Sequence, residues 1–232
     1  MSGSGNVTLG SGTLTVHVVR FPGTTYSGVI SGTGGLNVIG SGANFGYLYL
    51  NGNNSYTGTT TVSGATLGGT GSIAGPVTVD SSSAMSVLAP GLPTSPFVGI
   101  LNTGAVSFVG GATFSASMRG PNPGSGYTQL NVTGSVNLTN ANLVTQLASS
   151  PAPVLGQVYT IINATGPVSG TFIGYPEGTL INFGFATLAI SLCARRNSAY
   201  NKLAFMWSRK SGARGGYHRD NKESATLRTI GL

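Results

Sequence analysis

The sequence is poor in charged residues. Only 6% of its 232 residues are Asp, Glu, Lys or Arg, against about 25% in an ordinary soluble domain. Residues 1–190 contain two charges of each sign, Arg20 and Arg119 against Asp80 and Glu177. Catalytic and metal sites need groups that titrate or coordinate. This region therefore offers little material for either kind of site.

Cysteine and long apolar runs are scarce as well. Cys193 is the only cysteine, so the chain has no intrachain disulfide. The most apolar run, residues 180–192, is shorter than the eighteen or so residues of a membrane span and contains Asn182 and Gly184. The first ten residues show neither the basic nor the apolar region of a secretory signal. We expect no membrane-spanning helix and no signal peptide within this sequence.

Strong helix formers are rare before residue 190, whereas Gly, Thr, Ser and Asn are abundant, and 38 residues are Gly. Short segments of alternating apolar residues recur between Gly, Asn, Ser or Pro, as is typical of short strands. These segments are 13–19, 47–50, 59–62, 75–80, 105–110, 135–140 and 158–163. Because 40% of the residues are hydrophobic, we expect an ordered chain of the all-β class.

Internal repeats narrow the choice of β fold. The triplet Tyr26-Ser27-Gly28 recurs in similar form as Tyr56-Thr57-Gly58. The segment 101–114 recurs in similar form as 130–143, and both begin with Leu-Asn, as residues 36–40 also do. A period of about 30 residues predicts a β-solenoid, in which each repeat buries its apolar face on its neighbours. Stacking would align Asn, Ser and Thr into ladders, and Gly would supply positive φ at the corners. A β-sandwich is the alternative architecture.

Several blocks resemble the autotransporter-associated β-strand repeat and its companion segments. YSGVISGTGGLNVIGSG (26–42) followed by LNGNNSYTGTTTVSGATL (50–67) resembles the repeat itself, with its Gly-rich turn, short strand, G-x-N-x-Y-T-G-x-T-T-V and G-x-L. Residues 69–91 resemble a connecting rung that ends in APG, and residues 124–143 and 156–191 resemble the last rungs of such passengers. The resemblance covers residues 22–191 and keeps the expected order of blocks.

This resemblance implies a right-handed, single-stranded parallel β-helix that is secreted and displayed at the surface of a Gram-negative-type bacterium. It implies a non-enzymatic, adhesin-like and virulence-associated passenger, a stalk or adhesive surface that contacts a host cell, a neighbouring cell or glycans. The family's export signal and its outer-membrane barrel or sorting tail are not recognised in this sequence. Thr128 stands where the family often has Asp, and the family pattern stops near residue 191.

Six residues of the repeat are expected to set its register and to have a structural role. Asn and Gly would form corners, Thr and Val would form the strand, and Tyr would mark the position of each repeat. The expected register residues are Tyr26, Gly28, Asn54, Tyr56, Gly58 and Gly64.

Candidates for chemistry in residues 1–190 are few. Asp80 and Glu177 are the only carboxylates for glycoside hydrolysis, and they lie far apart in turn-like segments. His17 lies on the polar face of an alternating strand, without a G-x-S-x-G motif elsewhere. No Cys/His pattern has zinc-ligand spacing, and no phosphate-binding glycine motif is complete. We expect no catalytic residue, cofactor, metal or small-molecule substrate. The alternative, a β-helical polysaccharide lyase or hydrolase, requires Asp80, Glu177 and Arg119 to converge in one groove.

Residues 191–232 differ in composition from the rest. They contain nine Lys or Arg with Asp220 and Glu223, which accounts for the whole net charge of +7. Basic residues among aromatic ones are typical of segments that bind single-stranded nucleic acid or an anionic surface. The basic candidates are Arg195, Arg196, Arg209, Lys210 and Arg214. We expect a β-helical region at 1–191 and a disordered or irregular tail at 192–232, outside the fold. The tail is then a natural extension or the product of a shifted reading frame, and nucleic-acid binding is the alternative.

Overall fold

The computed structural model describes residues 2–18, 23–40, 46–194 and 201–207. Within these ranges the secondary structure consists of strands and turns, without helix, which confirms the predicted all-β class. The described residues accordingly include no helix that is long and apolar enough to cross a membrane.

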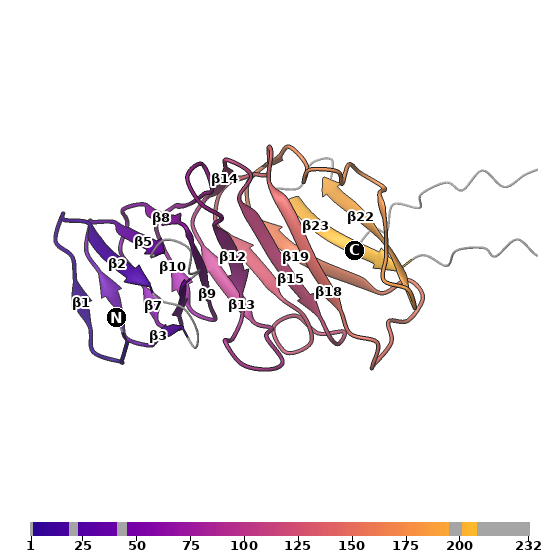
Figure 1. Ribbon diagram of the computed structural model, residues 1–232, viewed down its shortest axis with the longest axis horizontal. Coiled ribbons are helices and arrows are strands. Elements are labelled where there is room, and N and C mark those ends of the chain that lie inside the picture. Colours follow the sequence, from indigo (N-terminus) through magenta and orange to yellow (C-terminus); the bar gives the residue numbers. More distant parts are fainter. Residues whose placement is uncertain (1, 19–22, 41–45, 195–200, 208–232) are drawn as a thin grey trace, which may run out of the picture.

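Three extended sheets contain nearly all of the strands (Figure 1). The six-stranded sheet consists of β3 (Thr24–Tyr26), β6 (Gly46–Leu50), β9 (Ala65–Gly69), β12 (Val87–Pro90), β15 (Thr113–Met118) and β18 (Asn142–Leu147). The eight-stranded sheet consists of β7 (Asn53–Asn54), β10 (Ser72–Ile73), β13 (Ile100–Thr103), β16 (Gln129–Val132), β19 (Val158–Ala164), β23 (Asn201–Trp207), β22 (Thr187–Ala194) and β21 (Leu180–Asn182). The seven-stranded sheet consists of β2 (Leu14–Val18), β5 (Leu36–Gly40), β8 (Thr60–Ser63), β11 (Val77–Asp80), β14 (Val106–Val109), β17 (Val136–Asn137) and β20 (Val168–Ser169). A small fourth sheet pairs β1 (Val7–Thr8) with β4 (Ile30–Ser31).

The chain visits the three extended sheets in turn. From β1 to β17, each strand except β4 pairs in parallel with the strand three places later, so that β6, β7 and β8 lie beside β9, β10 and β11. We call one passage through the sheets a circuit. Six circuits run from β3 to β20, with β4 in the middle position of the first. Figure 1 shows them following one another along the long axis, from indigo to orange. This parallel stacking is compatible with the predicted solenoid and does not fit a β-sandwich, whose sheets are antiparallel.

Alternation along each strand places one set of side chains inside the stack. In β5, Leu36 and Val38 are completely buried, and they pair with Thr60 and Val62 of β8. The same inner columns continue in the next circuits as Val77 and Val79, then Val106 and Phe108, and the first column goes on to Val136. Short strands suffice because each apolar side chain is covered by its equivalents in the circuits before and after it.

One corner of the circuits is longer in the second half of the chain. Between the six-stranded and eight-stranded sheets, β6 and β7 are joined by residues 51–52, and β9 and β10 by residues 70–71. The next three circuits carry much longer loops at this place, residues 91–99, 119–128 and 148–157. We call these three loops the long-loop corner. They contain several exposed apolar side chains: Leu92, Phe97, Val154 and Leu155.

The C-terminal strands correct the expected boundary at residue 191. Strand β22 continues through that boundary to Ala194, and β23 pairs antiparallel with both β19 and β22. Leu203 and Phe205 of β23 are buried, whereas Lys202 is exposed. The segment joins the sheet through this antiparallel pairing and the burial of its apolar residues, although its composition differs from that of the earlier strands. Residues 195–200 and 208–232 of the expected tail lie outside the described residues.

Candidate functional site

The charged groups considered for catalysis occupy different parts of the fold. Asp80 ends β11, and Glu177 lies in the segment after β20. These two strands are three places apart in the seven-stranded sheet, about 14 Å at the usual strand spacing. Arg119 follows β15 of the six-stranded sheet and lies over the ring of Phe97, with its guanidinium carbon 5.8 Å from the ring centroid. The residues that a lyase or hydrolase would need thus follow strands of three different circuits.

The local contacts of these groups are those of turns and surface strands. The Asp80 carboxylate accepts a hydrogen bond from the backbone amide of Ser82 at 2.8 Å. The hydroxyl and the amide of Ser82 lower the pKa of Asp80, so this group is a turn cap with an ionised carboxylate. Glu177 accepts a hydrogen bond from the Ser191 hydroxyl at 3.0 Å. His17 is exposed on β2, as its place on the polar face predicts.

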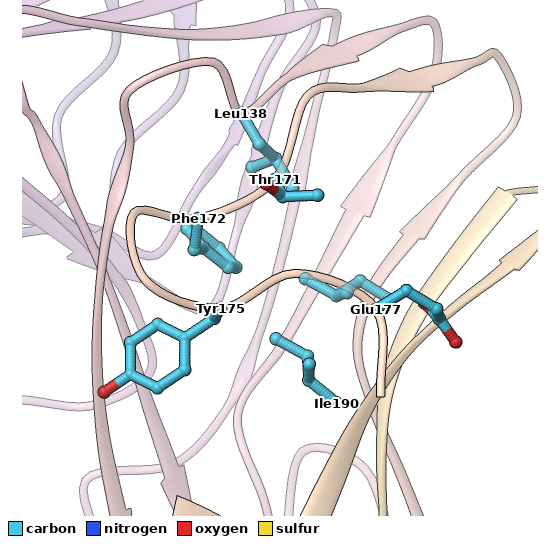
Figure 2. Close-up of a pocket in the computed structure, with 7 residues that line it drawn as sticks. Leu138, Thr171, Phe172, Tyr175, Glu177 and Ile190 are labelled. Atoms are coloured by element: carbon cyan, nitrogen blue, oxygen red, sulfur yellow. The ribbon is translucent and has the colours of Figure 1, made fainter. Parts of the chain in front are cut away.

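A depression near the last circuit is lined mainly by apolar side chains. Its walls are Leu138, Thr171, Phe172, Tyr175, Glu177, Ile190 and Leu203. Figure 2 shows that the Glu177 carboxylate and the Tyr175 hydroxyl point away from Phe172. The space does not admit a water molecule. Nor do the described residues contain a cluster of three His, Cys, Asp or Glu side chains that could hold a metal ion.

Asn54 is the most highly connected of the expected register residues. Its side chain is 1% exposed. Its Oδ1 accepts a hydrogen bond from the amide of Ile30 at 3.0 Å, and its Nδ2 donates to the carbonyls of Gly52 and Ser72, both at 3.0 Å. One buried amide therefore joins three successive circuits, through β4, its own strand β7, and β10. This is a structural role.

Tyr56, two residues after Asn54, is buried, and it differs in position from Tyr26. Tyr56 follows β7 and shares a hydrogen bond with the Thr60 hydroxyl. Tyr26 ends β3, pairs with Leu50, and donates its hydroxyl to the carbonyl of Gly5. The two Tyr-x-Gly triplets that the repeat pattern matches are therefore not equivalent positions of the stack. The two Leu-Asn pairs are not equivalent either. Leu36 is in the seven-stranded sheet, whereas Leu101 is in the eight-stranded sheet.

The three expected register glycines have two different reasons to be glycine. Gly64 has a φ of 64°, which confirms the predicted use of glycine for positive φ at a corner. Gly28 and Gly58 instead lie against the backbone of the preceding circuit. A Cβ on Gly28 would overlap the carbonyl of Gly5, and one on Gly58 would lie 2.5 Å from the carbonyl carbon of Gly34. At these two positions the absent side chain lets successive circuits approach each other.

A polar ladder follows the outer face of the eight-stranded sheet. Five residues are in register on successive strands: Asn53, Ser72, Asn102, Asn131 and Asn163. Asn131 donates to Asn102 at 3.0 Å, and Asn163 donates to Asn131 at 3.3 Å. This confirms the prediction that stacking aligns Asn and Ser into ladders. Much of the hydrogen-bonding capacity of the ladder is directed along the stack.

Sequence reasoning misses one surface feature, the pair of tyrosines in β6. Leu48 and Leu50 are completely buried, so Tyr47 and Tyr49, which alternate with them, lie on the outer face of the six-stranded sheet. Their rings are parallel, with an interplanar angle of 1° and centroids 6.2 Å apart. The alternation in YLYL is a usable signal, because it places both aromatics on one face. The prediction for this segment extends only to a strand.

The basic candidates of the tail, Arg195, Arg196, Arg209, Lys210 and Arg214, lie outside the described residues. Comparison with known proteins leaves the resemblance to autotransporter passengers as a prediction. No protein-family model matches the chain, and no curated protein gives a significant match.

Because of Tyr56, we expect the stability of the fold to decrease as the pH rises in the alkaline range. Burial raises its pKa to about 12, although the Thr60 hydrogen bond acts in the opposite direction. An unfolded tyrosine titrates near pH 10, so between about pH 10 and 12 the unfolded state releases this proton first and stability falls as the pH rises, by about 3 kcal/mol in total.

Replacement of Tyr56 by Phe tests this assignment. The variant should be about 1 kcal/mol less stable than the parent at neutral pH, because a buried hydrogen bond is lost. It should then lose less stability than the parent above about pH 10. Urea unfolding of both proteins across this pH range provides the measurement. The other tyrosines are common to both chains, so parallel pH curves would contradict the assignment.

Proposed function

We propose that this chain is a non-enzymatic part of a secreted passenger protein at the surface of a Gram-negative-type bacterium. In this proposal the stack of circuits is a right-handed, single-stranded parallel β-helix that serves as a stalk or adhesive surface. One observation carries the proposal: six circuits lie in register, and their strands contain a single charged residue, Asp80. Such a region has a regular framework of strands but few side chains that could act in catalysis.

The stack has the properties that a stalk requires. Each circuit buries its inner side chains on its neighbours, so the core is continuous along the axis and grows with the number of circuits. The outer face of the seven-stranded sheet repeats small polar residues in register: Thr15, Asn37, Thr61, Thr78, Ser107 and Asn137. Rows of identical weak contacts can act together on a repetitive surface, since linked sites bind more tightly than isolated ones.

The two alternatives have less support. A polysaccharide lyase or hydrolase needs acids and a base in one groove, and the separation of Asp80, Glu177 and Arg119 provides no such group. Binding of nucleic acid through the tail would depend mainly on residues beyond 207. Lys202 is the one basic residue after 191 that the structure describes, and it is exposed on β23.

Surface display can be tested on cells that produce the native protein. Antibodies raised against the 232-residue chain should label intact cells as strongly as permeabilised ones, whereas a cytoplasmic marker should be labelled only after permeabilisation. Labelling of the chain only in permeabilised cells would contradict the proposal. A crystal structure of the chain would determine the handedness of the stack directly.

A further inference from the structure

We propose that Tyr47 and Tyr49 form a binding platform for an uncharged polysaccharide on the outer face of the six-stranded sheet. The inference rests on the proposed function, because a surface-exposed stack is where such a platform would meet a glycan. It adds a location and a ligand class to that function.

The two rings have a fixed and repeated orientation. They project from alternate positions of β6, a strand that pairs on both sides, with β3 and with β9. Their planes differ by only 1°. Tyrosine has few rotatable bonds, so a ring already held by its neighbours loses little conformational entropy when a ligand binds. Parallel rings on a regular strand suit a ligand that itself repeats along a line.

Two glycines, Gly68 of β9 and Gly23 directly before β3, make room for the rings. A Cβ on Gly68 would lie 2.9 Å from Cδ1 and 3.0 Å from Cε1 of Tyr49. A Cβ on Gly23 would lie 2.8 Å from Cβ of Tyr47 and 3.3 Å from Cε2 of Tyr49. The Tyr49 ring therefore lies low against the sheet, in space that any other residue at these positions would occupy.

The chemistry around the rings favours an uncharged ligand with hydroxyl groups. None of the strands of the six-stranded sheet contains a charged residue or a histidine. Thr25 is half-buried and in register with Tyr49, whereas Thr66, in register with Tyr47, is buried. Sugar rings combine flat C–H faces, which stack on aromatic rings, with hydroxyl groups that bond to the hydroxyls of Thr25 and of the two tyrosines. A polysaccharide thus matches both parts of this surface, whereas an ionic ligand finds no partner on its strands.

A second copy of the chain fits this surface less well. A stable protein–protein interface buries about 800 Å² on each partner, and the aromatic part here consists of two partly buried rings. The other side chains in the same row are small, those of Thr25, Gly68 and Ala89. Self-association through the rings is nevertheless distinguishable in the experiment below.

Affinity electrophoresis of the full chain tests the platform. The probes are hydroxyethylcellulose and galactomannan, which are uncharged, and carboxymethylcellulose, which has the cellulose backbone with added charge. The two uncharged polymers should retard the parent protein, in a cationic buffer system in which the basic chain migrates. The Tyr47→Ala/Tyr49→Ala variant should bind at least about tenfold more weakly, as expected when aromatic anchors are removed.

Two matched variants separate recognition from folding. Tyr47→Phe/Tyr49→Phe keeps both rings and should retain most of the binding. Thr61→Ala/Thr78→Ala changes the outer face of the seven-stranded sheet and should leave binding unchanged. If the double alanine variant melts well below the parent, Tyr47→Ala alone replaces it, because the Tyr49 ring then still covers Gly68.

Several outcomes would overturn the platform. These are no retardation by either uncharged polymer, equal retardation of the parent and the alanine variant, or retardation by carboxymethylcellulose alone. A dimer in sedimentation that is lost in the alanine variant would assign the rings to self-association instead. None of these results bears on surface display, which the labelling of intact cells tests separately.

Discussion

Replacing Asn54 with alanine should lower the free energy of unfolding by about 3 kcal/mol, because the buried Ile30 amide loses its acceptor, at a cost of about 1–3 kcal/mol, and two carbonyls each lose one hydrogen bond, although that of Gly52 keeps the bond from the Ser72 amide. The change removes the acceptor of the Ile30 amide and the donor to the carbonyls of Gly52 and Ser72. Ile30 is completely buried, so water cannot replace the lost acceptor.

Asn53 provides the matched control for this change. It is the neighbouring residue in β7 and has the same side chain, but it is exposed, and its Oδ1 accepts only a 3.5 Å contact from Ser72. Asn53→Ala should therefore change stability by no more than about 0.5 kcal/mol. Urea unfolding gives both values, and hydrogen exchange should show faster exchange of the Ile30 amide in Asn54→Ala alone. Equal effects at the two positions would contradict the assigned role of Asn54.

Gly58→Ala should cost about 3 kcal/mol, because the added Cβ meets backbone that has no freedom to turn away and forced repacking of a tight contact typically costs about 1–3 kcal/mol or somewhat more. The Cβ would lie 2.5 Å from the carbonyl carbon of Gly34 and 2.7 Å from the amide nitrogen of Gly35. The two circuits would have to move apart to accept it.

Two other glycines calibrate this result. A Cβ on Gly5 meets nothing within 4 Å, so Gly5→Ala should be nearly neutral. Gly64 has a positive φ and a nearest neighbour, Cβ of Ala84, at 3.3 Å, so Gly64→Ala should cost about 1 kcal/mol from backbone strain alone. In thermal and urea unfolding, Gly58→Ala should be the least stable of the three variants, Gly64→Ala intermediate and Gly5→Ala the most stable. A Gly58→Ala protein as stable as Gly5→Ala would show that the circuits tolerate a wider separation than the structure has.

The sequence is most informative where one strand is enough to identify a pattern. Alternation in segments such as LTVHV and VTVD predicts strands in which buried residues alternate with less buried ones, as found in β2 and β11. The repeat of 101–114 at 130–143 is also correct, because Leu101 pairs with Leu130 and Thr113 pairs with Asn142.

A single constant period is less successful, because the circuits are unequal in length. Thr60, Val77 and Val106 follow one another in one column of the seven-stranded sheet, and the first interval is much shorter in sequence than the second. A constant spacing therefore matches Tyr26 with Tyr56, although Tyr26 lies beside Leu50. Local sequence does not show which loop between two strands is short, since that depends on which sheet each strand joins.

Composition is misleading at the C-terminal end, and the outer surface is hard to predict from sequence. The basic character of residues after 191 suggests a tail outside the fold, but β23 pairs with β19 and β22 and buries Leu203 and Phe205. The parallel rings of Tyr47 and Tyr49 depend on Gly23 and Gly68, which come from different parts of the chain. Such a relation becomes visible only when the register between strands is known.

The long-loop corner has a consequence for how this molecule can vary. The last three circuits carry their longest connections at 91–99, 119–128 and 148–157, while the strands on either side keep their register. One flank of the stack is thus free to gain or lose residues, and the other flanks are held to a more constant outline. Insertions that accumulate in these loops would change the surface on that flank without altering the stacked strands or the direction of the long axis.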